Sequence, residues 1–148
     1  IDSMRNINAN LNIIGIGPIE QELKLISKDL LNVKFLGRVE NLEQEFRDAT
    51  VLILPSINAA EMFGIVQIEA FARGIPVIST VIPNSGVQLV NKDNFTGFTC
   101  SICSSKSLEE TINKFLSNSH KFDSKIIRNE YLNQYSNKKF KENFLKIL

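Results

Sequence analysis

The sequence predicts a single α/β domain built on an open parallel sheet. Short apolar runs rich in β-branched residues alternate along the chain with amphipathic stretches, which is the pattern of successive strand–helix units. A length of 148 residues suits one compact core. Because nearly continuous apolar strands are typical of sheets buried on both sides, we expect helices on both faces of this sheet.

Five apolar runs are predicted to be strands, the last being the weakest. They cover residues 11–16, 33–36, 51–54, 76–79 and 97–99.

The stretches between and after these runs are predicted to be helices. The first begins just after Pro18, since proline is favoured at helix starts, and the third is closed by Gly74. The predicted helices cover residues 19–31, 42–49, 65–73, 107–116, 124–135 and 137–148.

The composition excludes several classes of protein. The chain is 43% apolar and 22% charged, and it has no apolar run long enough to cross a membrane. Its net charge of +1, without a basic cluster on one face, argues against nucleic-acid binding. Two cysteines and no secretory leader indicate a cytoplasmic protein. Cys100 and Cys103 stand alone as a Cys-x-x-Cys pair, so we expect no metal site, and His120 is expected at the surface.

Functional residues are expected where the strands end. Open parallel sheets bind their ligands outside the carboxyl ends of the strands. Four segments therefore qualify, namely residues 15–18, 37–39, 55–64 and 80–86.

The third segment is the richest in chemistry. Gly64 precedes a helix that has no Ser, Thr, Asp or Asn to cap it, so the N–H groups of Ile65 and Val66 are free for an anion such as a diphosphate. Glu69 lies in this nearly all-apolar helix and is expected to be buried, where it could accept hydrogen bonds from a ribose diol, while Glu61 could hold sugar hydroxyls. The alternative is that Glu61 is a solvated loop residue and Glu69 a charge favoured by the helix dipole.

A resemblance adds to these observations. The stretch from Glu61 to Ala70, with two glutamates separated by seven residues, resembles the donor-site signature of the retaining glycosyltransferases of family four. The neighbouring blocks agree in order and spacing. They are Ile13-Ile14-Gly15-Ile16-Gly17-Pro18, Val33-Lys34-Phe35-Leu36-Gly37, Leu54-Pro55-Ser56 and Ala72-Arg73-Gly74-Ile75-Pro76-Val77-Ile78.

The resemblance implies a fold and an activity. It implies the Rossmann-like, doubly wound C-terminal half of a GT-B enzyme, which binds a nucleoside-diphosphate sugar and transfers the sugar, with retention, to a glycan or lipid-linked acceptor. No metal and no cofactor beyond this sugar donor are implied.

The resemblance also implies roles for individual residues. Glu61 would contact the donor sugar as the catalytic residue, and Glu69 would hold the ribose. The remaining binding residues would be backbone groups of Phe63, Gly64, Ile65 and Val66 at the sugar and diphosphate, Gly37, Arg38 and Val39 at the base, and Gly17 as a minor contact.

The chain departs from the family pattern in two ways. The family has an Arg and a Lys early in this domain that bind the donor phosphates, and no segment here matches them. By the family layout, residues 1–10 are the tail of the first helix, so the first, central strand, the basic pair and the N-terminal acceptor domain are expected upstream of Ile1. Gln88 stands where the family usually has Glu.

Residues 1–148 are accordingly expected to form an incomplete donor-binding domain that binds nucleotide but transfers no sugar alone. The alternative function is a non-catalytic binding or scaffold module from a split or degenerate transferase gene. Contact with the inner face of the membrane through the basic, apolar helix 137–148 is a weaker expectation, the alternative being an ordinary solvated helix.

Overall fold

The computed structural model describes residues 1–146, and it contains all five predicted strands. All adjacent strands pair in parallel, as expected. The predicted bounds are correct to within two residues. The strands are β1 (Leu11–Ile14), β2 (Val33–Gly37), β3 (Leu52–Leu54), β4 (Val77–Val81) and β5 (Gly97–Ser101).

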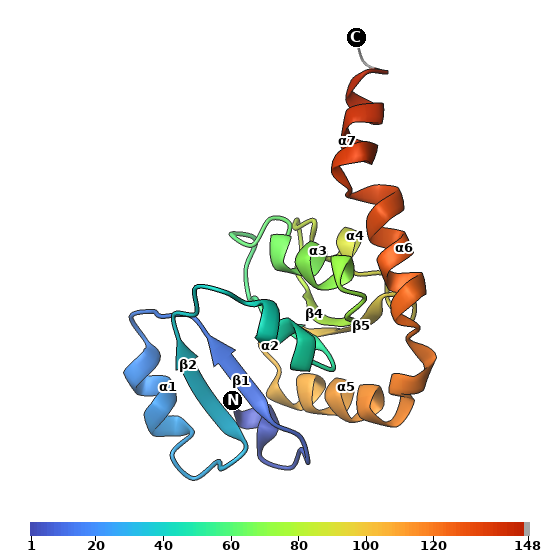
Figure 1. Ribbon diagram of the computed structural model, residues 1–148. Helices are drawn as coiled ribbons and strands as arrows, with labels where there is room; N and C mark the ends of the chain where they lie inside the picture. Colours follow the sequence, from blue (N-terminus) through green and yellow to red (C-terminus); the bar gives the residue numbers. More distant parts are fainter. Residues whose placement is uncertain (147–148) are drawn as a thin grey trace.

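The strands form two sheets, which agrees with the expectation that the central strand of the sheet is lacking. β1 pairs with β2, and β3, β4 and β5 form a second sheet in that order. Figure 1 shows β1 on the side of β2 that faces the three-stranded sheet. The expected α/β architecture is therefore present, but its sheet is interrupted between β1 and β3.

Helices follow the strands as predicted, with two differences. A four-residue helix, α4, was not predicted because it is too short to show a period, and residues 1–10 contain only a 3-10 turn, Asp2–Met4, where the end of a helix was expected. The helices are α1 (Glu20–Ile26), α2 (Glu43–Asp48), α3 (Ile65–Ala72), α4 (Val87–Val90), α5 (Ser105–Asn118), α6 (Ser124–Gln134) and α7 (Asn137–Phe144), with a 3-10 turn at Ser119–Lys121.

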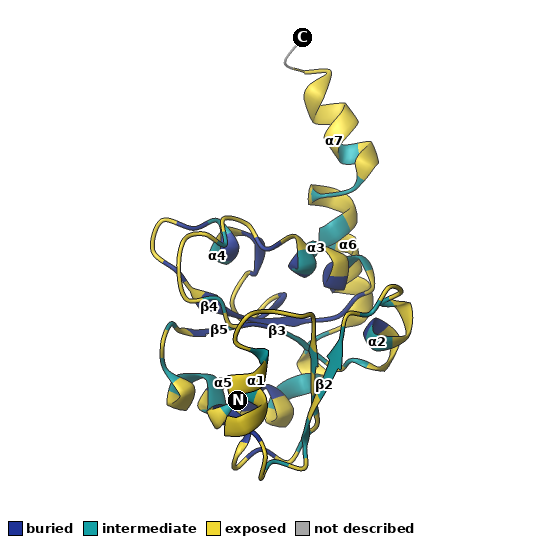
Figure 2. Cartoon of the chain, turned by 90° about the vertical axis from the view of Figure 1, so that its left-hand side faces the viewer, coloured by how far each residue is buried: buried dark blue, intermediate teal, exposed yellow. Residues whose placement is uncertain are grey.

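The core has one layer on each face of the β3–β5 sheet. On one face, Ile78 and Phe98 pack with α5 and with Met4 and Ile7 from the N-terminal segment. On the other face, the buried residues come from α2, α3, β4, α4, α6 and the turn before β4, and are Phe46, Ala70, Phe71, Ile75, Val77, Val90 and Ile127. Figure 2 shows the consequence, since β4 and β5 are largely buried whereas β2 is only half-buried.

The first helix is covered less than its sequence predicts. The apolar spacing of residues 19–31 indicates a buried face, yet α1 is seven residues long and contains no buried residue. The expectation of a long, packed helix was wrong because α1 lies against the two-stranded sheet alone, which offers too little apolar surface to cover it.

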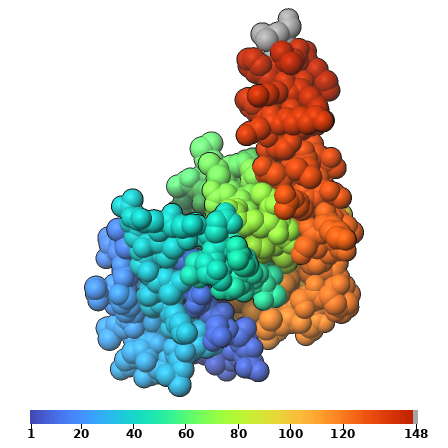
Figure 3. Space-filling view, in the orientation of Figure 1, coloured from blue at the N-terminus to red at the C-terminus, as the bar shows by residue number. Residues whose placement is uncertain are grey.

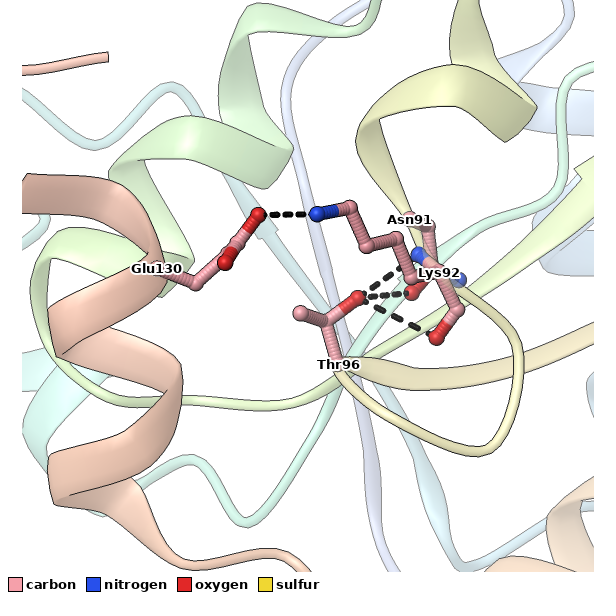
Figure 4. A network of polar contacts seen from close by, with 4 residues as sticks. All are labelled: Asn91, Lys92, Thr96 and Glu130. Carbon is pink, nitrogen blue, oxygen red and sulfur yellow. Dashed lines mark hydrogen bonds and ion pairs between the residues drawn. The ribbon is translucent and has the colours of Figure 1, made fainter. Parts of the chain in front are cut away.

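Asn91 joins the strands of the larger sheet. Its buried side-chain amide donates to the carbonyl oxygens of Val77 and Phe98 at 3.1 and 2.9 Å, and to Ser79 Oγ at 2.9 Å. Thr96 Oγ1 donates to Asn91 Oδ1 at 3.0 Å, and the neighbouring Lys92 forms an ion pair with Glu130 of α6 (Figure 4). This network fixes the end of α4 against β4 and β5.

The last helix leaves the body of the protein. α7 has no buried residue, and it extends away from the sheets beyond the end of α6 (Figures 1 and 3). The last two residues of the helix predicted at 137–148 lie outside the described residues.

Candidate functional site

The segment between β3 and α3 turns into the helix at Gly64. This residue is buried and has a φ of 73°, in the left-handed region that glycine adopts without strain. A Cβ at this position would lie 2.6 Å from Leu54 Cδ2 and 2.7 Å from Gln67 Nε2. Only glycine therefore allows α3 to start this close to the end of β3.

The start of α3 presents unpaired backbone donors, as expected. No side chain caps the helix through its N-cap residue, and Gln67 N–H donates to Gly64 O at 2.9 Å. Among residues 1–146, the N–H groups of Ile65 and Val66 have no acceptor. These two donors, at the positive end of the helix dipole, suit an anionic ligand.

Glu61 lies beside this helix start. Its Oε1 accepts the N–H of Gly64 at 2.9 Å, so the carboxylate is tied to the turn. The loop around it is held from the next strand end, because Ser85 Oγ donates to Glu61 O and Gly86 N–H donates to Met62 O at 2.7 Å. These hydrogen bonds thus join the predicted functional segments 55–64 and 80–86 to each other.

Gln67 is a contributor that the sequence analysis did not identify. Its side chain is fully buried, and Nε2 donates to the carbonyl oxygens of Phe63 and Val87 at 3.0 and 3.4 Å. Its Oε1 has no partner among the described residues. A polar residue in the most apolar of the predicted helices was the signal that could have pointed to it.

The expectation that Glu69 is buried was wrong. α3 buries Gln67, Ala70 and Phe71, whereas Glu69 is exposed and Ile65 is 68% exposed. The apolar composition of the helix suggested burial all round, but only one face meets the sheet. Glu69 therefore pays no desolvation cost and is accessible one turn beyond the helix start.

Apolar side chains are exposed around the same helix start. Met62 is 74% exposed and Phe63 is 40% exposed, in addition to Ile65. Together with the free N–H groups, these side chains form an open surface that is apolar around a polar centre. Apolar lining with a few placed polar groups is typical of ligand sites.

The remaining predicted site residues lie at the two-stranded sheet of β1 and β2. Gly37 follows β2, and its carbonyl oxygen accepts the N–H of Gly15 at 2.7 Å, so the ends of β1 and β2 are joined. Arg38 and Gly17 are exposed and Val39 is half-buried. These residues lie at the carboxyl ends of their strands, as predicted, but no hydrogen bond among the described residues links them to Glu61 or α3.

Gln88 has a structural role in the fourth segment. Its Oε1 accepts the N–H of Ile82 at 3.0 Å, which closes the loop between β4 and α4.

A cavity lies elsewhere on the molecule. It measures about 570 Å³ and lies before the amino ends of β3 and β4, where its lining includes Arg47, Arg73 and Arg128 but none of the predicted site residues. The candidate site is therefore an open surface at the opposite ends of the strands.

The two cysteines are free. Cys100 is buried, which raises the pKa of its thiol, and Cys103 is exposed. His120 is exposed, as expected. Within residues 1–146 no three His, Cys, Asp or Glu side chains are grouped to hold a metal ion, and no helix there is both long and apolar enough to cross a bilayer.

Comparison with known proteins identifies the family of the chain. The family described as "Glycosyl transferases group 1" matches residues 1–133. The chain belongs to this family. Among curated members, this group 1 glycosyltransferase domain is 26% identical over 122 residues to an uncharacterized glycosyltransferase of Methanocaldococcus jannaschii, covering 80% of this chain and 34% of that protein. It is 31% identical over 101 residues to the D-rhamnosyltransferase WbpZ of Pseudomonas aeruginosa, covering 66% of this chain and 26% of that protein.

Solved structures show the same fold for the group 1 domain. The apo lipopolysaccharide outer core galactosyltransferase WaaB has a TM-score of 0.81 at 23% identity, with 99% of this chain and 44% of that chain covered. Sucrose-phosphate synthase from Thermosynechococcus elongatus has a TM-score of 0.82 at 21% identity, with 99% and 39% covered. The chain thus has the Rossmann-like fold of the C-terminal half of GT-B glycosyltransferases, and it spans about a quarter to a third of the length of the first curated relatives.

Proposed function

We propose that this chain is the donor-binding part of a retaining glycosyltransferase that takes a sugar from a nucleoside diphosphate and delivers it to a glycan or lipid-linked acceptor. The observation that carries the proposal is the start of α3, where the N–H groups of Ile65 and Val66 are unpaired beside the carboxylate of Glu61. Family membership supports it, and a structure of Anabaena HepE with UDP-glucose has the same fold, with a TM-score of 0.71.

Each group at the helix start has a chemical role in this proposal. The two N–H groups and the helix dipole bind the diphosphate and stabilise the negative charge that grows on it as the sugar departs. Glu69, exposed one turn further on, accepts hydrogen bonds from the ribose hydroxyls. Glu61 keeps one oxygen on Gly64 N–H and offers the other to the donor sugar.

The residues on the two-stranded sheet complete the proposed donor site. Gly37, Arg38 and Val39 contact the base, and Gly17 approaches the donor from the end of β1. The acceptor is held by a second domain, because Glu61, Phe63 and Ile65 lie on an open surface that leaves the sugar uncovered on one side.

Calorimetric titration of the chain with UDP, GDP, ADP and UDP-glucose tests the proposal. We expect one nucleoside diphosphate to bind, and Glu69→Gln to weaken it about tenfold, since a hydrogen bond to a charged group contributes about 1.5–3 kcal/mol. Glu110→Gln, on the exposed surface of α5, is the matched control and should change nothing.

A different result would favour the non-catalytic module. If no nucleotide binds at about millimolar concentration, where the binding free energy is only about 4 kcal/mol, the donor-binding function is excluded. If a nucleotide binds and Glu69→Gln does not weaken it, the role of Glu69 is excluded. Sugar transfer by the chain alone would contradict the requirement for an acceptor domain.

For the location of the protein we propose the cytoplasmic side of a membrane, touched through α7. Phe140 and Phe144 are 69% and 54% exposed and their rings stack, and the same helix carries Lys138, Lys139 and Lys141. Such a helix suits an anionic lipid surface. Sedimentation with anionic vesicles should be lost in a Phe140→Ser, Phe144→Ser chain, and absence of sedimentation of the unchanged chain would leave α7 an ordinary solvated helix.

A further inference from the structure

The cavity before the amino ends of β3 and β4 is lined by residues of α2, the turn after α3, α5 and α6. In that turn Gly74 has a φ of 74°, and a Cβ there would lie 2.5 Å from Ser124 O. The turn after α3 is therefore in close contact with the start of α6, and both contribute to the wall of the cavity.

The charges of the lining are mostly positive. Arg47, Arg73 and Arg128 line the cavity with one acidic residue, Glu43, so three positive charges against one negative leave two positive charges in excess. Asp123 precedes α6 but is not part of the lining, and its carboxylate caps that helix by accepting backbone N–H groups. The cavity therefore favours an anion.

One of the three arginines is fixed, whereas the other two are free to bind. Arg73 Nη1 donates to a backbone carbonyl oxygen of α3 at 2.8 Å. Its Nη2 forms an ion pair with Glu43, and its guanidinium carbon lies 4.4 Å from the centroid of the Phe46 ring. Among residues 1–146, Arg47 and Arg128 form no hydrogen bond or ion pair through their side chains. The one acidic residue is thus already neutralised, and two guanidinium groups keep all their donors.

Hydroxyl groups and an apolar wall complete the lining. The hydroxyl groups of Thr50, Ser119 and Ser124 have no hydrogen-bond partner in the part of the chain that the structure describes. Buried Pro76 and half-buried Phe122 supply apolar surface. The volume of about 570 Å³ is typical of small-molecule sites, so the cavity has room for more than a single inorganic ion.

We propose that this cavity binds a small molecule that carries a phosphate or diphosphate group. Arg47 and Arg128 bind the phosphate oxygens, because a planar guanidinium can donate two parallel hydrogen bonds to them. Arg73 adds its charge from a fixed position, and Phe122 and Pro76 contact the uncharged part of the ligand.

This site is independent of the proposed donor site. None of the residues proposed to bind the sugar donor lines the cavity, and the two sites lie at opposite ends of the strands. Both can therefore be occupied at once, and the proposal does not rest on the proposed function.

An NMR titration of the isotope-labelled chain with inorganic pyrophosphate tests the proposal, because each amide reports on its own surroundings. The amides of Gly74 and Ser124 report on the cavity. Those of Ile65 and Val66 report on the start of α3, which pyrophosphate can also reach. Citrate, a tricarboxylate of comparable charge, is the second probe.

A double substitution, Arg47→Gln with Arg128→Gln, removes the two free guanidinium groups. Both side chains are exposed and unpaired, so the variant should fold, which circular dichroism checks. The matched control is Arg5→Gln with Lys106→Gln, which removes the same charge from two side chains outside the cavity.

We expect pyrophosphate to shift the amides of Gly74 and Ser124 in the unchanged chain and in the control. The Arg47, Arg128 variant should bind pyrophosphate at the cavity at least about tenfold more weakly, since hydrogen bonds from charged donors are the stronger ones. Citrate should bind more weakly than pyrophosphate, because a phosphate group offers more acceptor oxygens than a carboxylate.

Three results would each overturn the proposal. The first is no shift at Gly74 and Ser124 at about 10 mM pyrophosphate, including the case in which only Ile65 and Val66 respond. The second is equal binding by the two double variants, which would mean that net charge alone attracts the anion. The third is citrate binding as tight as that of pyrophosphate, which would remove the preference for phosphate.

Discussion

The carboxylate of Glu61 and the backbone N–H of Gly64 are joined by a 2.9 Å hydrogen bond, which places an acidic side chain at the entrance of α3. The same carboxylate thereby serves the fold and, in the proposed function, the donor sugar. These two roles can be separated, because a glutamine side chain still offers an acceptor oxygen but carries no charge.

Glu61→Ala should lower the free energy of unfolding by about 1 kcal/mol, as loss of a capping acceptor does. Glu61→Gln should retain most of that stability because it can still accept the Gly64 N–H. Urea denaturation measures both. Equal destabilisation by the two substitutions would show that charge, and not the hydrogen bond, holds the turn.

Gly64→Ala should be more damaging. The new Cβ would lie 2.6 Å from Leu54 Cδ2, and the residue would retain a φ of 73°, so we expect a loss of about 1–3 kcal/mol. Gly17→Ala is the control, since a Cβ there meets nothing within 4 Å. Thermal denaturation of both variants checks this prediction. Equal melting temperatures for the two variants would contradict it.

Asn91→Ala should destabilise the larger sheet. The substitution removes donors to Val77 O, Phe98 O and Ser79 Oγ in a site that is 1% exposed, and it leaves buried acceptors unpaired. We expect a loss of about 2–4 kcal/mol. Asn118→Ala, whose side chain bonds one exposed carbonyl, should cost far less in the same denaturation assay.

The ion pair between Glu43 and Arg73 should make stability depend on pH in the acid range. The hydrogen bond from Arg73, and then its charge, lower the pKa of Glu43 below its ordinary value of 4.5. A carboxyl with a lowered pKa in the folded state stabilises it above the unfolded-state value, and this contribution is lost as the pH falls through the folded-state value. Wild-type and Glu43→Gln chains should therefore differ in melting temperature near neutrality and converge in acid. A constant difference at all pH values would contradict this assignment.

The order of strands and helices could be predicted from the sequence because each depends on local pattern. The apolar runs gave all five strands, and Pro18 and Gly74 marked real helix boundaries. α4 could not be found, since four residues show no period. The interruption between β1 and β3 was not visible in any local pattern, because pairing between strands depends on what lies beside them, but it agrees with the expectation, drawn from the resemblance, that a central strand is lacking.

The candidate site was predicted only in part, because some of its features follow from chain order and others depend on contacts between distant residues. The uncapped start of α3 and the nearness of residues 80–86 follow from chain order in a parallel sheet, and both are present. The exposure of Glu69 was missed because an apolar composition does not say how much of a helix surface the neighbours cover. The role of Gln67 depends on the carbonyl of Val87, 20 positions away, and no local pattern encodes such a contact.

At the outer edge of β5, Asp93 Oδ1 accepts the N–H of Thr99 and Ser107 Oγ accepts the N–H of Ser101. These two hydrogen bonds affect how the protein self-associates at high concentration. An edge strand with free N–H groups is a template for strands of other molecules, and such pairing begins aggregation. The N–H groups of Thr99 and Ser101 are already bonded, so β5 offers neither of them to another strand. We therefore expect pairing of β5 with strands of other molecules to be disfavoured at high protein concentration.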